Sequence, residues 1–161
     1  SSHAKRVAAL LERGVARERV FFAPKKDLAG HIARMRAADL FLDTWPCNAH
    51  TTASEALWAG VPVLTVPGAT FASRVAASLV TACGLGELAC DTEDDYVELA
   101  TALANEPDTL RGIKAHLELH RRSLLLFDAE RLARDMDALL LRMHERHLAG
   151  LAPQALAAGR A

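Results

Sequence analysis

The chain has 161 residues, 51% of them hydrophobic, which is enough for one domain with a real core. Its formal net charge is −1 and its charged fraction is ordinary, so nucleic acid and anionic membranes are not the expected partners. No apolar run approaches the length that spans a bilayer, and we expect no signal peptide.

Three cysteines, Cys47, Cys83 and Cys90, are an odd number at unpatterned spacing. This spacing indicates neither a zinc knuckle nor a disulfide scaffold. We therefore expect reduced thiols in a cytoplasmic protein. The acidic cluster at residues 91–95 lacks the spacing of metal ligands, and we expect no bound metal and no other cofactor.

The first half of the chain alternates helices and strands. Apolar periodicity and Gly and Pro stops predict, in order, helix 4–13, strand 19–22, helix 27–38, strand 40–42, helix 51–59 and strand 62–66. In helix 27–38 we expect Ile32, Met35 and Ala38 to face inward.

The second half is richer in helices. The pattern predicts helix 70–82, a weak strand 88–90, and helices 93–105, 107–121 and 128–148. Asp128 is the expected N-cap of the last helix. The buried face expected for that helix consists of Leu132, Met136, Leu139, Leu140 and Met143. Residues 150–161 are expected to form a flexible tail.

Apolar strands that alternate with helices are typical of an α/β fold, in which a parallel sheet is covered by helices on both faces. A nucleotide-binding domain of this class normally begins with its central strand. This chain begins with a helix, so we expect the first strand to be missing.

The most informative segment follows strand 40–42. A polar turn leads from Asp43 to His50, and a helix begins with Thr51 and Thr52. Ligands of parallel sheets bind beyond the carboxyl ends of the strands. The first amides of a helix are unpaired and partly positive, which suits phosphate, and two threonine hydroxyls add donors. Glu55, one turn later, could grip sugar hydroxyls, so the segment outlines a nucleotide-sugar site.

Several of these residues also have a structural interpretation. Thr52 and Glu55 fit a capping box, which is compatible with phosphate binding because several amides are available. His50 could bind the diphosphate or only shape the turn. Cys47 could border the donor pocket or pack there, and Asn48 fits a turn-shaping role.

Several motifs in this order resemble one enzyme family. They are Cys47-Asn48, His50-Thr51-Thr52, Leu57 to Gly60, Pro67 to Ser78, His31 to Arg34 and Leu126 to Asp128. Together they resemble the protein O-GlcNAc transferases, their bacterial relatives and SPINDLY-like glycosyltransferases, over roughly residues 20 to 148.

The resemblance implies the second, Rossmann-like domain of a B-type glycosyltransferase. Residues 1–127 would then be a partial nucleotide-sugar-binding domain, residues 128–149 a carboxy-terminal amphipathic helix and residues 150–161 the flexible tail. The remaining amino-terminal part of the same enzyme would be a partner of this chain. Catalytic groups are expected largely in that other domain, so none is assigned here.

The resemblance also implies roles in binding the base and ribose. His31 would stack on uracil and Arg34 would help hold the base. The backbone at Ala23 would contact uracil, and either Lys25 or Lys26 would lie near the ribose. In the family, an acidic residue at the position of Glu55 holds the ribose hydroxyls.

The function implied is transfer of a sugar, GlcNAc from UDP-GlcNAc in the first place, to Ser or Thr hydroxyls of an acceptor protein. The alternative is a non-catalytic α/β module that binds a nucleotide or a protein. A Rossmann-type oxidoreductase is set aside because no Gly-x-Gly-x-x-Gly motif follows the first strand.

Overall fold

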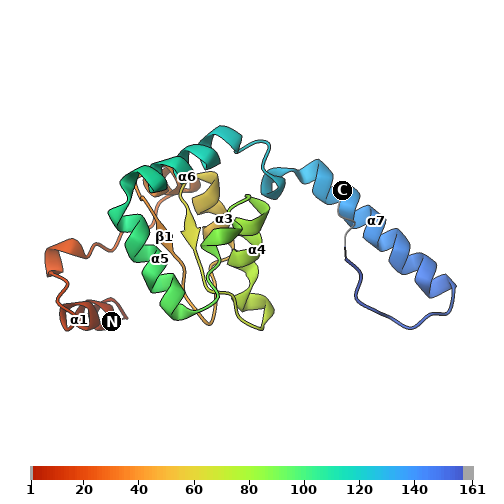
Figure 1. Cartoon of the computed structure of the whole chain (residues 1–161), viewed down its shortest axis with the longest axis horizontal. Coiled ribbons are helices and arrows are strands. Elements are labelled where there is room, and N and C mark those ends of the chain that lie inside the picture. Colours follow the sequence, from red (N-terminus) through yellow and green to blue (C-terminus); the bar gives the residue numbers. More distant parts are fainter. Residues whose placement is uncertain (1, 158–161) are drawn as a thin grey trace. The chain divides into compact units, whose positions relative to one another are not determined.

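A computed structural model of the protein describes residues 2–157 (Figure 1). The chain divides into two compact units, residues 1–31 and residues 32–161. The divisions expected after residues 127 and 149 stay predictions. Within the described residues, no helix is both long and apolar enough to cross a membrane.

The first unit contains helix α1 (Ser2–Leu11), a 3-10 turn η1 (Arg17–Arg19) and the beginning of α2 (Leu28–Met35). The prediction of a strand over 19–22 is wrong, because residues 20–27 form neither helix nor strand. A strand needs a neighbour for its backbone amides, and no described residue forms a ladder with this segment. Phe21 is accordingly 86% exposed.

The second unit carries the remaining elements. They are β1 (Phe41–Leu42), α3 (Thr51–Trp58), β2 (Val63–Leu64), η2 (Phe71–Ser73), α4 (Val75–Ala82), η3 (Gly86–Leu88), α5 (Glu93–Asn105), α6 (Pro107–His120), η4 (Leu125–Phe127) and α7 (Ala129–Leu148). All the predicted helices occur. The one expected over 70–82 is divided into η2 and α4 at Arg74.

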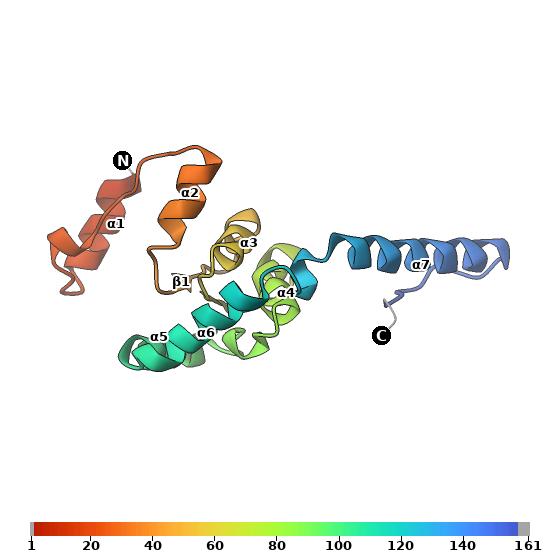
Figure 2. The ribbon, with the colours of Figure 1, turned by 90° about the horizontal axis from the view of Figure 1, so that it is seen from above.

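The sheet is parallel, as predicted, but small. Phe41 pairs with Val63 and Leu42 with Leu64. The expected strand 88–90 is reduced to a single parallel bridge between Thr65 and Ala89. In Figures 1 and 2 the strands lie between α5 on one side and α3 on the other, so helices cover both sides of the sheet.

The core surrounds β2, where Val63 and Leu64 are fully buried. On α3, the small side chains of Ala53 and Ala56 are also fully buried, so this helix lies close against the sheet. Its position relative to the strand ends is therefore set by tight packing.

Tyr96 of α5 fixes the carboxyl end of β1. Its hydroxyl donates to the Asp43 carbonyl over 2.9 Å, and its ring lies edge-on to Trp45 at 5.1 Å between centroids. Burial, together with the nearby charges of Asp43 and Cys90, raises the pKa of Tyr96 to about 12. The hydroxyl thus stays a donor throughout the neutral range.

The predicted buried faces are correct only in part. Ile32 and Met35 pack against the core, whereas Ala38 is exposed. The prediction of a buried face on α7 is wrong, because this helix has no buried residue and Leu140 is 55% exposed. An amphipathic pattern identifies an apolar face, and no element among residues 2–157 covers this one.

The other predictions for this region concern the ends of α7. Asp128 is its N-cap, as predicted, and accepts from the Arg131 amide over 2.8 Å. Residues 151–157 form no helix or strand, and Arg142 and Arg146 donate to the carbonyls of Ala157 and Ala152. The last four residues of the predicted flexible tail, 158–161, lie outside the described residues.

Replacing Tyr96 by Phe should lower the free energy of unfolding by about 1 kcal/mol at neutral pH, since one buried hydrogen bond is lost. Because burial raises the pKa of Tyr96, its contribution to stability is present below pH 10 and is lost as the pH rises through about 12. The Phe variant should lack this alkaline component. Urea unfolding across that range measures it, and an identical alkaline loss in both proteins would contradict the assignment.

Leu57 and Leu140 provide a matched pair for the packing of the two helix faces. Leu57→Ala should cost about 2–5 kcal/mol because this fully buried side chain would leave a cavity. Leu140→Ala should change stability by less than about 0.5 kcal/mol, since its side chain is exposed. Chemical unfolding of both variants measures the two changes in the free energy of unfolding. An equal loss in both would contradict the exposed position of Leu140.

Candidate functional site

Helix α3 begins at Thr51 without a side-chain cap. His50 occupies the N-cap position, and the first hydrogen bond of the helix runs from the Ser54 amide to the His50 carbonyl over 3.1 Å. The amides of residues 51–53 therefore precede the helical ladder and point beyond its end. The side chains of Thr51 and Thr52 are exposed.

The alternative interpretation of Thr52 and Glu55 as a capping box is not borne out. Thr52 lies inside the helix as its second residue, whereas a capping box needs the hydroxyl residue just before the helix. Within residues 2–157, the hydroxyls of Thr51 and Thr52 make no hydrogen bond to the protein. Both side chains are therefore available to a ligand.

The turn before α3 is held by its own polar groups. The Thr44 hydroxyl donates to the Cys47 carbonyl, and the Asn48 side-chain amide donates back to the Thr44 carbonyl, each over 3.1 Å. Asn48 is buried, which agrees with a turn-shaping role, and Cys47 is exposed at the surface of the turn. The turn is thus formed before any ligand arrives.

His50 joins this turn to the loop that follows β2. Its Nε2 lies 3.3 Å from the Ala72 carbonyl oxygen, and its ring is edge-on to Phe71 at 5.9 Å between centroids. The backbone amide of Asn48 donates to the same carbonyl over 2.9 Å. When Nε2 carries the proton for that contact, Nδ1 is the ring nitrogen left to face a ligand.

The structure gathers one group of predicted residues at the start of α3. Cys47, Asn48, His50, Thr51, Thr52 and Glu55 lie in or beside the first turns of α3, where Glu55 is half-buried. Ala23, Lys25, Lys26 and His31 belong to the unit of residues 1–31, which is described by itself. His31 is half-buried on α2, whereas Arg34, three residues later on the same helix, belongs to the unit of residues 32–161.

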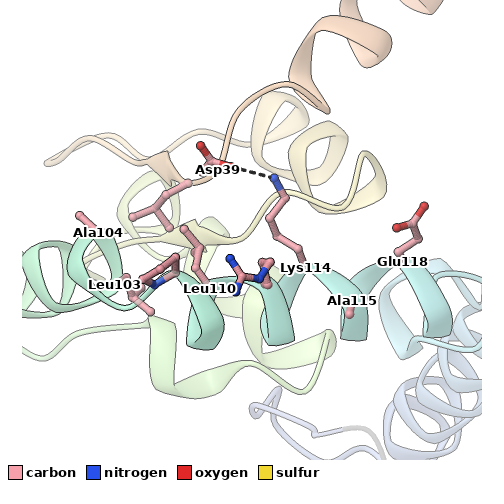
Figure 3. A pocket seen from close by; sticks show the side chains of 10 residues that line it. Asp39, Leu103, Ala104, Leu110, Lys114, Ala115 and Glu118 are labelled. Atoms are coloured by element: carbon pink, nitrogen blue, oxygen red, sulfur yellow. Dashed lines mark hydrogen bonds and ion pairs between the residues drawn. The ribbon is translucent and has the colours of Figure 1, made fainter.

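Two of the hollows on the second unit matter here, one because it adjoins His50 and one because it is the larger of the two. A groove of about 430 Å³ is lined by Phe71, Arg74 and Ser78, and therefore adjoins His50 through Phe71. A larger groove, of about 770 Å³, lies between the segment before β1 and helices α5 and α6, where Lys114 reaches Asp39 (Figure 3). No predicted site residue lines the larger groove.

The cysteines differ in environment. Cys47 is exposed, whereas burial raises the pKa of the Cys83 thiol to about 11. Burial also raises the pKa of Cys90, with smaller contributions from the charges of Asp95 and Asp91. Within the described residues, no group of three or more His, Cys, Asp or Glu side chains is placed to hold a metal ion.

Sequence reasoning missed the polar contacts that cross the fold to the end of β1. Thr65, at the end of β2, and Tyr96, on α5, both bond to Asp43. The available signals were a threonine within an apolar strand and the single tyrosine of the chain. Neither signal names its partner, since these contacts link residues 22 and 53 positions apart.

Comparisons with known proteins place the chain in a family. The model of glycosyl transferase family 41 matches residues 2–136. A UDP-N-acetylglucosamine–peptide N-acetylglucosaminyltransferase of Caenorhabditis elegans is 38% identical over 88% of this chain and 12% of its own length. The probable enzyme of this name called SPINDLY from Hordeum vulgare is 33% identical over 92% of this chain and 16% of its length.

A solved structure is also similar. A mutant of the Thermobaculum terrenum O-GlcNAc transferase superposes with a TM-score of 0.75 at 36% sequence identity, over 87% of this chain and 27% of that protein. The chain thus spans a small part of the length of its relatives. Because the family model matches well over half of the sequence, the chain belongs to glycosyl transferase family 41.

Proposed function

We propose that this chain is the donor-binding part of a glycosyltransferase that moves GlcNAc from UDP-GlcNAc to Ser or Thr hydroxyls of proteins. The observation that carries the proposal is the uncapped start of α3, with Thr51 and Thr52 exposed and unbonded. Relatives that cover most of this chain bear the name of that activity.

The diphosphate of the donor would lie at the amino end of α3. Amides 51–53 and the hydroxyls of Thr51 and Thr52 supply donors, and the helix dipole favours negative charge at this end. When the sugar leaves, charge grows on the diphosphate, and donors that are already in place stabilise it. His50 contributes a further contact, and this scheme needs no metal ion or other cofactor.

The other predicted residues would hold the nucleoside. Glu55 lies one turn along α3 from the diphosphate and would bind the ribose hydroxyls. His31 and Arg34 of α2, the Ala23 backbone and Lys25 or Lys26 would hold uracil and ribose. Cys47 and Asn48 would border the pocket at the turn before α3.

The chain would act as the second, Rossmann-like domain of a B-type enzyme. The acceptor protein and the catalytic groups would approach from the other domain, and closure of the cleft would exclude water. Three free cysteines support a cytoplasmic location, and neither nucleic acid nor a membrane is a partner in this scheme.

Replacing both Thr51 and Thr52 by Ala should raise the Kd for UDP about 10- to 100-fold, since two hydrogen bonds to a charged group are lost. Calorimetric titration of the complete polypeptide that contains residues 1–161 measures this. The control is Thr101→Ala, an exposed threonine of α5 whose hydroxyl bonds only within its helix. The Kd of the Thr101→Ala variant for UDP should equal that of the wild type.

Two outcomes would contradict the proposal: a wild-type protein that does not bind UDP, and a double variant that binds UDP as tightly as the wild type. A protein that binds UDP but transfers no sugar to any protein would instead favour the non-catalytic alternative.

UDP should also protect Cys47 from a maleimide, because this exposed thiol borders the proposed pocket. Without UDP, Cys47 should react at least about tenfold faster than Cys83 and Cys90, whose raised pKa values leave little thiolate at neutral pH. Peptide mass spectrometry measures each rate, with Cys47→Ser as the control. Labelling of Cys47 that is equally fast with saturating UDP would place the donor elsewhere.

A further inference from the structure

A buried carboxylate lies at the end of β1 and bonds to the turn that leads into the candidate site. Asp43 follows β1 and is 3% exposed. Its Oδ1 accepts from the Ala49 amide and its Oδ2 from the Thr65 hydroxyl, each over 2.7 Å. A buried carboxylate is costly unless it is hydrogen-bonded, and both oxygens have short contacts with donors.

The Asp43 carboxylate connects the end of β1 to the turn that leads into α3. The backbone of Asp43 is held on two sides, since its amide donates to the Leu64 carbonyl over 3.0 Å and its carbonyl accepts from Tyr96. The bond to the Ala49 amide closes the turn of residues 44–48 onto this support. Ala49 immediately precedes His50, the N-cap of α3. This bond therefore connects the end of β1 to the entry of the helix, beside the contacts that the turn makes within itself and with Ala72.

The two oxygens have separable tasks. The hydrogen bond at Oδ2 joins the ends of β1 and β2, so we expect it to stabilise the sheet. The hydrogen bond at Oδ1 joins the end of β1 to the residue before the N-cap, so we expect it to position the start of α3. A substitution at Thr65 therefore removes the hydrogen bond at Oδ2 and keeps the hydrogen bond at Oδ1.

We propose that Asp43 is a positioning residue for donor binding. Its carboxylate holds Ala49 and His50 so that the amides and hydroxyls at Thr51 and Thr52 converge on the diphosphate. Asp43 does not touch the donor, because its oxygens are buried and already bonded. This inference rests on the proposed function and adds the residue that supports its site.

A geometric role makes a specific prediction for Asn at this position. In Asp43→Asn the side-chain oxygen can still accept from the Ala49 amide, and the new NH₂ group can donate to the Thr65 hydroxyl, which can also accept. The substitution removes a negative charge near an anion site and keeps the geometry. UDP affinity should therefore be retained in Asp43→Asn and lost in Asp43→Ala.

The test uses the complete polypeptide, with UDP affinity from calorimetry, the melting temperature, and hydrogen exchange of the Ala49 amide by mass spectrometry. Asp43→Ala should raise the Kd for UDP at least tenfold and speed exchange at Ala49 at least tenfold. Asp43→Asn should stay within threefold of the wild type in both. Thr65→Val, the matched control, should lower the melting temperature and leave both values within threefold.

Should Asp43→Ala fail to fold, Asp43→Glu serves as the second variant, because it keeps the charge and displaces the oxygens by one methylene. It should raise the Kd for UDP at least fivefold. Wild-type affinity in a folded Asp43→Ala or Asp43→Glu protein would overturn the positioning role. Equal losses of affinity in Asp43→Ala and Thr65→Val would also overturn it, since they would indicate general damage. Absence of UDP binding in the wild type would instead sink the proposed function itself.

Discussion

The proposed donor site depends on the unpaired amides at the start of α3. A helix end must satisfy these groups with a cap, with water or with a ligand. Here the N-cap is His50, whose side chain makes no capping bond, and the threonine hydroxyls are exposed. A helix that begins in this way, after a short turn from the end of a parallel strand, has the properties that suit an anion, and the proposed donor site rests on them.

The surrounding fold keeps that end in place. Ala53 and Ala56 seat α3 on the sheet, and Asp43 fixes the entry to the helix from the end of β1. The Ala72 carbonyl accepts from the Asn48 amide and contacts His50, which joins the loops after both strands. Two loops that are far apart in the sequence thus form one prearranged surface, so little ordering is left to the moment of binding.

Local patterns predicted the elements whose causes are local. The helix at residues 93–105 was predicted with its observed bounds, and Thr92 and Asp95 form a capping box there. The start of α3 at Thr51 was also predicted, whereas the capping box that Thr52 and Glu55 could form is absent, because Thr52 lies inside the helix and His50 holds the N-cap position. The position of α3 itself, and with it the candidate anion site, was predictable.

What depends on distant partners could not be predicted in this way. The segment 19–22 has the composition of a strand, but a strand exists only where another strand pairs with it. The apolar stripe of α7 is a local fact, whereas its burial depends on what lies against it. The contacts of Asp43 with Thr65 and Tyr96 likewise arise only when the sheet and α5 assemble.

A crystal structure of the complete protein with UDP would show whether the diphosphate binds at the start of α3. We expect phosphate oxygens within hydrogen-bond distance of the Thr51 or Thr52 amides, with one threonine hydroxyl in contact. A UDP molecule bound elsewhere, with side chains packed over the first turn of α3, would contradict it.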